Sequence, residues 1–401
     1  MEKTMTAKLF EGVKIADFSR VIVGPATVKT LGDYGAQVIK IEGRSRLGHY
    51  RTTAPEPDLS AHFTSWNTGK LSITLNLSIP KGVELAKRIV SWADIVVESF
   101  AGQSMDRMGL GYEVLKKVKP DIIMLSSCMQ GQTGPFARHP GWGFQLSGLA
   151  GFSHTVGWPD RPSPELGVYT DFIAPNFNVC ALLAALLYKK RTGKGQYIDM
   201  SQLENAVQFM APAVLDYTVN QRTANRMGNK CDYAAPHNAY RCMGDDRWCA
   251  ISVFTDEEWE SLCKVIGDPK LTGESKFGTL SGRKKNEDEL DRLIEGWTKV
   301  RSAEEVMSSL QSAGVPAGIL ETGEDQLEKD PQFKHRHMFE EVDHPRMGKH
   351  HPVGSPFILS KAVCEVRRAP LLGEHTEYIL KEILGMTEEE IADWVIQGAV
   401  E

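Results

Sequence analysis

The sequence lacks the short motifs that mark the commonest phosphate, nucleophile and metal sites. It contains neither G-x-G-x-x-G nor G-x-x-x-x-G-K-[ST], so a dinucleotide site or a P-loop has no motif support. It also contains no G-x-S-x-G elbow and no H-E-x-x-H pair. The stretch TGKGQ is short and follows a helical pattern, so it predicts a helix C-cap turn and not a phosphate loop.

Cysteine and long hydrophobic runs are also scarce. The seven cysteines are scattered, odd in number and free of any C-x-x-C pair, which favours free thiols in a reducing cytoplasm. The longest apolar run, residues 179–188, is too short to span a bilayer and predicts a buried helix. No apolar segment follows a basic start at the N-terminus, so we expect no signal peptide and no membrane partner.

The charge balance argues against a nucleic-acid partner. The formal net charge is -6, whereas nucleic-acid binding depends on cations that neutralise phosphate. A local basic pocket for an anionic ligand stays compatible with this charge. Five histidines between His335 and His351 match no metal-ligand spacing, so we expect loop histidines and no metal.

What the chain does contain is a regular alternation of strand and helix patterns. With 401 residues it is long enough for about two domains. Strand-like runs at 13–18, 36–42, 94–99 and 121–127 are separated by helical stretches such as 24–34 and 81–93. This alternation predicts βαβ units and a mostly parallel sheet.

A glycine- and proline-rich region follows the last of these strands and extends to about Pro175. Loops at the carboxyl ends of such strands are where α/β sheets bind ligands. The segment GVYTDFIAPN, residues 167–176, places the carboxylate of Asp171 in this region. Read alone, these ten residues favour a helix N-cap aspartate. Composition changes near residue 221, and 222–335 reads as a smaller α+β domain.

Several blocks of the sequence resemble the class III CoA-transferases, the family of formyl-CoA and carnitine CoA-transferases. The resemblance runs in order from residue 9 to about 385 and rests on the blocks LFEGVKIADFSRVIVGPATVKTLGDYGAQVIKIE, NTGKLSITLNL, FAGQSMDRMGLGYEVLKKVKPDIIMLSS, GQTGP, RTGKGQYIDMSQLENA and RRAPLLGEHTEYIL. It implies an α/β fold with a Rossmann-like large domain built from both chain ends, 1–221 and 336–401, around the small domain 222–335. It also implies an interlocked dimer.

The resemblance reverses the interpretation of Asp171. The family's nucleophilic aspartate follows a small-residue turn, here SGLAG, by about two dozen residues, and Asp171 stands at that place. The resemblance implies that its carboxylate attacks an acyl-CoA thioester to form a mixed anhydride, which CoA then converts to an aspartyl-CoA thioester. A position at a helix start predicts that the helix dipole keeps this carboxylate ionised.

The same resemblance implies the residues that contact CoA, the one cosubstrate expected. The expected contacts are Ile22, Val23, Arg44, Leu75, Asn76, Ser78, Ser99, Phe100, Ala101, Arg107 and His139. Arg107 suits a phosphate because its guanidinium donates in a bidentate fork. Gly43 departs from the family pattern, which often has a basic residue there, and Arg44 is the expected substitute. Trp142 and Tyr169 are expected to line the substrate pocket.

The expected reaction is CoA transfer from an acyl-CoA to a free carboxylic acid. Succinyl-CoA is a common family donor, and tryptophans 142 and 158 favour an aromatic acceptor. The chain also resembles benzylsuccinate CoA-transferases of anaerobic aromatic degradation. One alternative is α-methylacyl-CoA racemisation, but the racemases carry a GHD histidine where this chain has Trp142. The other is a non-catalytic CoA-binding subunit, so both a homodimer and a paralogous partner subunit stay open.

Overall fold

The computed structural model describes residues 8–401, which form two compact units. The larger unit comprises residues up to 152 together with 165–215 and 331–401, and the smaller unit comprises 153–164 and 216–330. These limits lie near the predicted boundaries, except that segment 153–164 joins the smaller unit. That the two predicted domains fold as separate domains stays a prediction.

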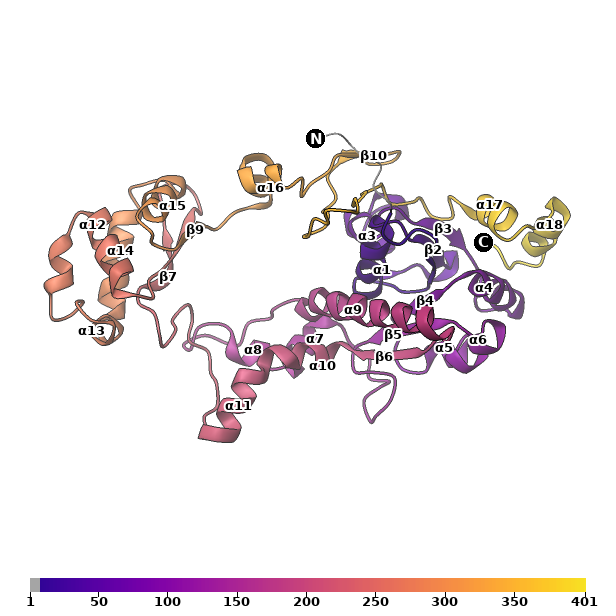
Figure 1. Cartoon of the computed structure of the whole chain (residues 1–401), viewed down its shortest axis with the longest axis horizontal. Coiled ribbons are helices and arrows are strands. Elements are labelled where there is room, and N and C mark those ends of the chain that lie inside the picture. The colour runs from indigo at the N-terminus through magenta and orange to yellow at the C-terminus, as the bar shows by residue number, and fades with distance from the viewer. Residues whose placement is uncertain (1–7) are drawn as a thin grey trace. The chain divides into compact units, whose positions relative to one another are not determined.

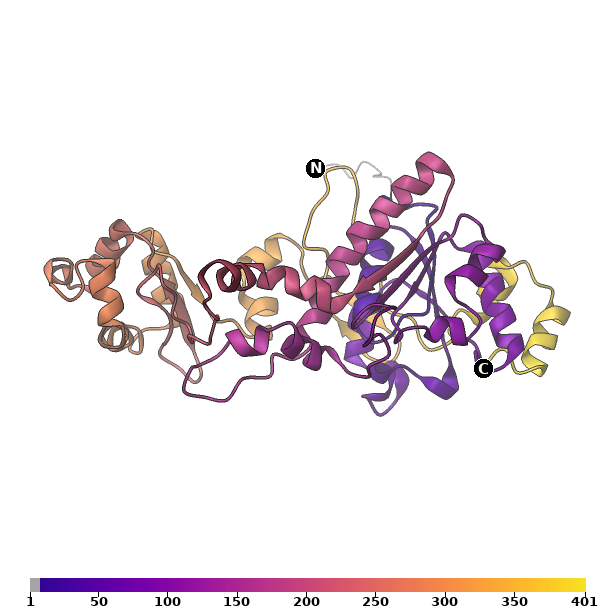
Figure 2. The same ribbon diagram turned by 90° about the horizontal axis from the view of Figure 1, so that it is seen from below.

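Six parallel strands form the centre of the larger unit (Figure 1, Figure 2). They stand in the order β3-β2-β1-β4-β5-β6, and each neighbouring pair is parallel. Their bounds are β1 Lys14–Asp17, β2 Gln37–Glu42, β3 Leu71–Thr74, β4 Ile95–Glu98, β5 Ile123–Cys128 and β6 Tyr197–Ser201. In this doubly wound order the topology reverses between β1 and β4, and ligands bind at the carboxyl ends of the strands near that point. The predicted α/β class is confirmed.

Helices cover both faces of this sheet (Figure 1). On one face, α1 (Val23–Asp33) and α9 (Tyr169–Thr192) share a core with the strands. On the other face lie α4 (Pro80–Trp92), α6 (Tyr112–Val118) and the C-terminal α18 (Glu388–Ile396). The sheet is therefore buried on both sides, as its nearly continuous apolar strands require.

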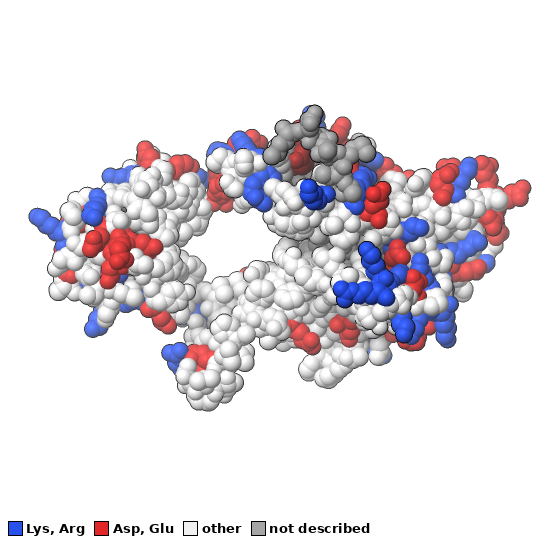
Figure 3. All heavy atoms as spheres, viewed as in Figure 1, with Lys and Arg blue, Asp and Glu red and all other residues white. Residues whose placement is uncertain are grey.

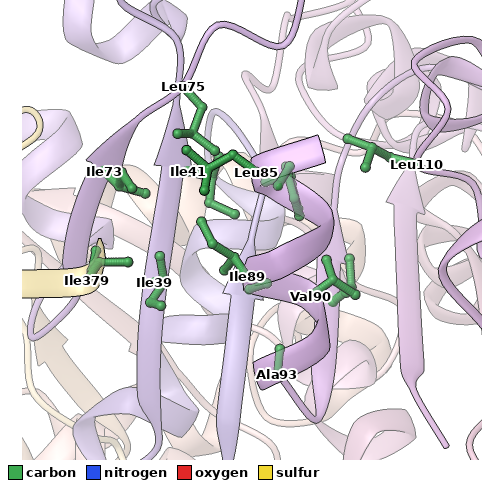
Figure 4. Close-up of a cluster of buried hydrophobic side chains, with 14 of the residues drawn as sticks. Ile39, Ile41, Ile73, Leu75, Leu85, Ile89, Val90, Ala93, Leu110 and Ile379 are labelled. Atoms are coloured by element: carbon green, nitrogen blue, oxygen red, sulfur yellow. The ribbon is translucent and has the colours of Figure 1, made fainter. Parts of the chain in front are cut away.

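Neighbouring strand residues point into different cores. In β1, Ile15 joins the core beneath α1 and α9, whereas Ala16 joins the core beneath α4. Figure 4 shows the second core, where Ile89 of α4 lies among strand residues and Ile379 from the C-terminal part joins the same cluster. The last part of the chain thus packs on the sheet that the first part builds. The prediction that both chain ends form the large Rossmann-like unit is confirmed.

Shorter elements complete the larger unit. They are α2 (His49–Thr52), α3 (Ala61–Trp66), α5 (Ser104–Arg107), α7 (Gly143–Leu149), α10 (Gln202–Val207), α16 (Pro331–His335), α17 (Thr376–Tyr378) and the hairpin β10 (Val342–His344) and β11 (Gly348–His350). Two further helices, α8 (Phe152–Thr155) and α11 (Ala211–Asn220), cross the limits between the units. Single 3₁₀ or π turns occur at Arg44–Arg46, Pro57–Leu59, Gln208–Met210, Pro269–Gly273, Asp325–Lys329 and Ile379–Ile383.

The smaller unit is built on an antiparallel sheet in the order β7-β8-β9. The strands are β7 His237–Arg241, β8 Trp248–Ser252 and β9 Ala317–Ile319. The helices are α12 Asp256–Ile266, α13 Leu280–Lys285, α14 Glu287–Thr298 and α15 Ala303–Ser312. Buried Trp259 and Leu262 of α12 belong to its core. Strands and helices together thus build the smaller unit, in agreement with the predicted α+β class of this region.

The apolar run at 179–188 lies within α9, which is longer than that run. With 24 residues, α9 is long and apolar enough to cross a membrane by length and composition alone, although the ten-residue run itself is not. Leu182 and Ala185 are nevertheless fully buried in the core against the sheet. A core helix of a globular unit passes the same length test, and the predicted buried helix is what the structure contains.

Candidate active site

Asp171 is the third residue of α9 and does not cap it. The N-cap position is Val168, whose carbonyl accepts a hydrogen bond from the backbone N–H of Asp171 at 2.9 Å. The N-cap interpretation of Asp171 is therefore wrong. Pro175 stands four residues later in the same helix and has no N–H to donate to the carbonyl of Asp171. The first turn of α9 is thus held less tightly at Asp171 than an unbroken helix would be.

The carboxyl group of Asp171 is buried without a counter-ion. The residue is 6% exposed, and its Oδ2 has no hydrogen-bond partner within residues 8–401. Burial raises the pKa of Asp171 to about 7, and only its own backbone N–H acts to lower it. The expectation that the helix dipole keeps this carboxylate fully ionised is therefore wrong, because loss of water outweighs the dipole. A carboxylate with a raised pKa is more basic and hence a stronger nucleophile once ionised.

Gly143, the first residue of α7, makes room for this carboxyl group. A Cβ atom at Gly143 would lie 2.1 Å from Asp171 Oδ2 and 2.9 Å from the Cα of Val168. Both contacts are far inside van der Waals distance, so any side chain here would displace the carboxyl group or the start of α9. Sequence reasoning missed Gly143, although it ends the GWG triplet that stands in place of the racemase motif.

Aromatic rings lie beside Asp171 along the chain on both sides. Phe172 is 5.7 Å from the ring of Trp66 in α3, and Tyr169 is 5.3 Å from the ring of Phe152. Trp142 directly precedes Gly143 and is 43% exposed, while Tyr169 is 46% exposed. Trp142 and Tyr169, the two predicted substrate-pocket residues, thus have much of their ring surface accessible to solvent, close to the Asp171 carboxyl group. Trp158, the other tryptophan expected near the site, belongs to the smaller unit.

A groove of about 960 Å³ opens at the carboxyl ends of β2, β3 and β4. It is lined by the segments that follow these strands and by α4 and α5. Its cations are Arg20, Arg46, Lys87 and Arg107, and Glu84 is its one acid among the described residues. Elsewhere, acidic and basic side chains are interspersed on the face drawn in Figure 3. The groove is therefore a basic site of a size suited to a large anionic ligand.

Five of the expected CoA contacts line this groove. They are Leu75, Asn76, Ser78, Phe100 and Arg107. The guanidinium of Arg107 donates to the Gly102 carbonyl at 3.3 Å and to Ser104 Oγ at 2.8 Å. These two bonds hold an otherwise exposed side chain at the groove wall.

The other expected contacts do not line the groove. Ile22 and Val23 are buried at the start of α1, and Ala101 and His139 are exposed elsewhere, His139 against the ring of Phe136. Arg44 is exposed beside the groove, whereas its neighbours Gly43, Ser45 and Arg46 line it.

Ser99 joins two loops of the sheet instead of facing the groove. Its Oγ accepts from the backbone N–H of Arg20 at 2.8 Å and donates to the carbonyl of Arg20 at 3.1 Å. It thereby fastens the loop after β4 to the loop after β1 at the point where the topology reverses.

Sequence reasoning missed three of the four groove cations. Arg20 is the third residue after β1, and its guanidinium lies 5.3 Å from the ring centre of Phe100. Its position at the carboxyl end of the first strand was a usable signal. Arg46 and Lys87 lie in a 3₁₀ turn and in α4, where a basic residue is ordinarily a solvated one, so no local pattern distinguished them.

A second, smaller cavity of about 20 Å³ adjoins the groove at Arg20, which lines both. Tyr50 of α2 also lines this cavity. Burial and, after it, the negative charge of Asp171 raise the pKa of Tyr50, so the Tyr50 ring lies within electrostatic reach of that carboxyl group. Tyr50 therefore lies near Asp171 and lines a cavity that shares Arg20 with the groove.

The histidine-rich segment forms no metal centre in the described part of the chain. No three His, Cys, Asp or Glu residues of that part are arranged to hold an ion. His344 and His350 face each other across the β10–β11 hairpin with ring centres 5.9 Å apart.

Known proteins resemble this chain over nearly its whole length. The family model described as CoA-transferase family III matches residues 10–376. Succinyl-CoA:glutarate CoA-transferase of Mus musculus is 32% identical, with 98% of this chain and 91% of the relative aligned. The succinyl-CoA–L-malate CoA-transferase beta subunit of Chloroflexus aurantiacus is 29% identical over 98% of both chains.

A solved structure shares the same architecture. The CAIB/BAIF family protein from Brucella suis superposes with a TM-score of 0.85 at 31% identity, covering 94% of this chain and 99% of that protein. The chain therefore belongs to CoA-transferase family III, and it is an enzyme that transfers CoA between an acyl-CoA and a carboxylic acid.

Proposed function

We propose that Asp171 is the nucleophile of this transfer and that the basic groove binds the CoA moiety. The observation that carries the proposal is the buried Asp171 carboxyl group, whose Oδ2 has no partner in the described chain, in a unit whose sheet also carries a groove with four cations. CoA is a long ligand whose phosphates need cations and whose thioester must reach a group shielded from water.

The first half of the reaction moves CoA onto the enzyme. The Asp171 carboxylate attacks the donor thioester carbonyl, the C–S bond breaks, and CoA leaves as a thiolate. The product is a mixed anhydride between Asp171 and the donor acid. The thiolate then attacks the aspartyl carbonyl, and the free donor acid leaves, which gives an aspartyl-CoA thioester.

The second half repeats these steps in reverse with the acceptor. The acceptor carboxylate attacks the aspartyl-CoA carbonyl and expels the thiolate, which forms a new anhydride. The thiolate then attacks the acceptor carbonyl, releases acyl-CoA and restores the Asp171 carboxylate. No net proton transfer is needed. Water competes with the thiolate at both anhydrides, so burial of Asp171 protects the intermediates. Backbone N–H groups of the glycine-rich loops are the proposed oxyanion donors.

Hydroxylamine trapping tests the nucleophile directly. Wild-type protein incubated with acyl-CoA and then hydroxylamine should carry a hydroxamate at Asp171, detected by mass spectrometry of the peptide. Asp171→Ala should carry none and should lose transfer. Full activity in Asp171→Ala would exclude the mechanism.

We propose succinyl-CoA as the donor and a dicarboxylic acid as the acceptor, on the basis of the relatives' names. The exposed rings of Trp142 and Tyr169 favour an aromatic member of that class, such as benzylsuccinate of anaerobic aromatic degradation. A panel of succinate, glutarate, L-malate, benzylsuccinate, carnitine and phenyllactate identifies the acceptor. Transfer to none of the aromatic acids would exclude the aromatic part of this proposal.

Two other roles are weaker. Racemisation needs acid–base groups on both faces of the α-carbon, and Trp142 stands where the racemase histidine would be. A non-catalytic role leaves the buried carboxyl group of Asp171 unexplained.

We further propose a cytoplasmic enzyme with free thiols, since all seven cysteines are unpaired. It would act as an interlocked homodimer or with a paralogous subunit.

A further inference from the structure

Several aromatic rings lie next to the segment that carries Asp171, which raises the question of what recognises a polar acyl group. Trp66, Trp142, Tyr169 and Phe172 offer ring surface, which suits an apolar acyl chain. A dicarboxylic acyl group also brings a second carboxylate, and burying it without donors is costly. Polar side chains close to Asp171 and free of other partners are therefore the ones to examine.

Helix α2 brings two such side chains, His49 and Tyr50. Within residues 8–401, the two ring nitrogens of His49 have no hydrogen-bond partner. The hydroxyl of Tyr50 has none there either. The ring of His49 meets the ring of Trp142 edge-on with centres 4.8 Å apart. Trp142 is the residue before Gly143, whose missing side chain makes room for the Asp171 carboxyl group.

Tyr50 lies within electrostatic reach of Asp171. It lines the small cavity together with Arg20, which also lines the groove. Its ring stacks on His62 with centres 4.8 Å apart and planes inclined by 18°. This stacking fixes the ring plane and leaves the hydroxyl as the group that can turn toward a ligand.

The position of α2 is held by a buried cation in the same helix. Arg51 is 1% exposed and donates to both oxygens of Glu42, at 3.1 and 2.9 Å, and to Asp58 at 2.7 Å. Its guanidinium also stacks 3.4 Å above the ring of Phe63. Because Arg51 is fixed at four places, its neighbours His49 and Tyr50 are presented on a rigid support.

We propose that His49 and Tyr50 recognise the acyl group carried by Asp171, and that His49 selects acyl groups with a second carboxylate. The proposal rests on the proposed role of Asp171. Tyr50 donates its hydroxyl proton in a hydrogen bond to the acyl oxygen near the thioester, which every acyl donor has. His49 donates a ring N–H to the distal carboxylate, which only a dicarboxylic acyl group has.

The experiment compares succinyl-CoA with butyryl-CoA as donors, because butyryl has four carbons with a methyl group in place of the second carboxylate. The measured quantity is the ratio of kcat/KM for the two donors, with one acceptor held constant. His49→Leu should lower this ratio by about 10- to 100-fold, the loss expected for a hydrogen bond to a charged group. His49→Gln keeps an N–H donor and should recover part of the ratio.

Tyr50→Phe should have a different signature. It should lower kcat/KM for both donors by about 10-fold or more and leave their ratio unchanged. The matched controls are His335→Leu and Tyr233→Phe, which replace exposed residues that line neither the groove nor the small cavity and should leave both values unchanged. Tm is measured for each variant, and the conservative His49→Gln and Tyr50→Phe variants keep the test valid if His49→Leu does not fold.

The outcomes separate this inference from the proposed function. If wild-type protein forms the Asp171 hydroxamate and transfers CoA, but His49→Leu leaves the ratio unchanged, the inference is wrong and the proposed function stands. An equal wild-type preference for butyryl-CoA and succinyl-CoA also contradicts it. If the wild-type protein forms no hydroxamate and transfers no CoA, both are wrong.

Discussion

At the scale of single residues, the buried carboxyl group of Asp171 governs the pH dependence of the reaction. Burial raises its pKa to about 7, so about half of the molecules hold an ionised nucleophile at pH 7. We expect kcat/KM for the acyl-CoA donor to rise with pH and to level off above this value. At pH 6 it should be about a tenth of the plateau. A profile that is flat between pH 5.5 and 8.5 would contradict this assignment.

The same burial predicts an effect on stability. The folded pKa lies above the ordinary value of 3.8, so the folded state holds the proton more tightly than the unfolded state does. Stability therefore falls as pH rises from about 4 through 7 and stays lower above that range. Asp171→Asn removes this cost, so its Tm should exceed that of the wild type at pH 8. The difference should vanish near pH 4, which a thermal series across pH will show.

Gly143 offers a test of position, because only the absence of a side chain leaves room for the Asp171 carboxyl group. In Gly143→Ala the new Cβ would lie 2.1 Å from Oδ2, so the carboxyl group must move. We expect kcat/KM to fall by about 100-fold or more, as for other displacements of a reacting group by about 1 Å. Gly148→Ala lies in the same helix, and its Cβ would meet nothing within 4 Å. Unchanged activity in Gly143→Ala would refute the placement of the nucleophile.

At the scale of elements, α2 depends on one buried ion cluster. Arg51 pairs with Glu42 of β2 and with Asp58, and both acids lose their cation in Arg51→Met. Removing one partner of a buried pair costs about 3 kcal/mol or more of unfolding free energy. Denaturant titration of Arg51→Met should show this loss. Arg44→Met is the control, because that side chain is exposed in the same segment. Equal stability of the two variants would show that α2 is held in another way.

The local sequence pattern was enough to predict some of the strands but not all of them. The nearly continuous apolar runs around β1, β2, β4 and β5 predicted these strands, because side chains of a buried sheet must be apolar on both faces. Strand β9 (Ala317–Ile319) has only three residues. Strand β3 (Leu71–Thr74) is as long as β1 and β4, but its apolar residues alternate with Ser72 and Thr74. The strand state of β3 and β9 is therefore decided by the neighbour that they pair with.

At the scale of the whole molecule, a chain of net charge -6 contains a basic groove. If this groove binds CoA phosphates, Arg107→Met should raise KM for acyl-CoA by about 10-fold and change kcat little, because the contact is equally strong before and during reaction. Glu84→Gln removes the acid of the groove and should lower KM. Lys361→Met, exposed and outside the groove, should change neither value.

Salt supplies an independent check of the groove. Raising ionic strength should increase KM for the wild type more than for Arg107→Met, since solvent-exposed charge pairs are screened. An identical salt response in both proteins, or an unchanged KM in Arg107→Met, would contradict the assignment of the groove to CoA.

The sequence by itself determined the α/β class, the family and the residue most suited to be the nucleophile. Strand and helix periods are local, and the order of the family blocks along the chain can be read without any knowledge of space. The same local reading misjudged Asp171 in two respects, its role as an N-cap and its ionisation. The N-cap falls on Val168 within the same ten residues, whereas the ionisation follows from the burial of the carboxyl group in the folded chain.

Only the tertiary structure decided how the site is built. The proximity of Gly143 to Asp171, the burial of that carboxyl group and the meeting of Arg20 with Tyr50 join segments far apart in the chain. The groove likewise collects Arg46, Lys87 and Arg107 from separate loops and helices at one edge of the sheet. Hydration, and with it the pKa of a carboxyl group, depends on every atom that excludes water. A one-dimensional pattern does not contain that information, because it records neighbours in sequence and not in space.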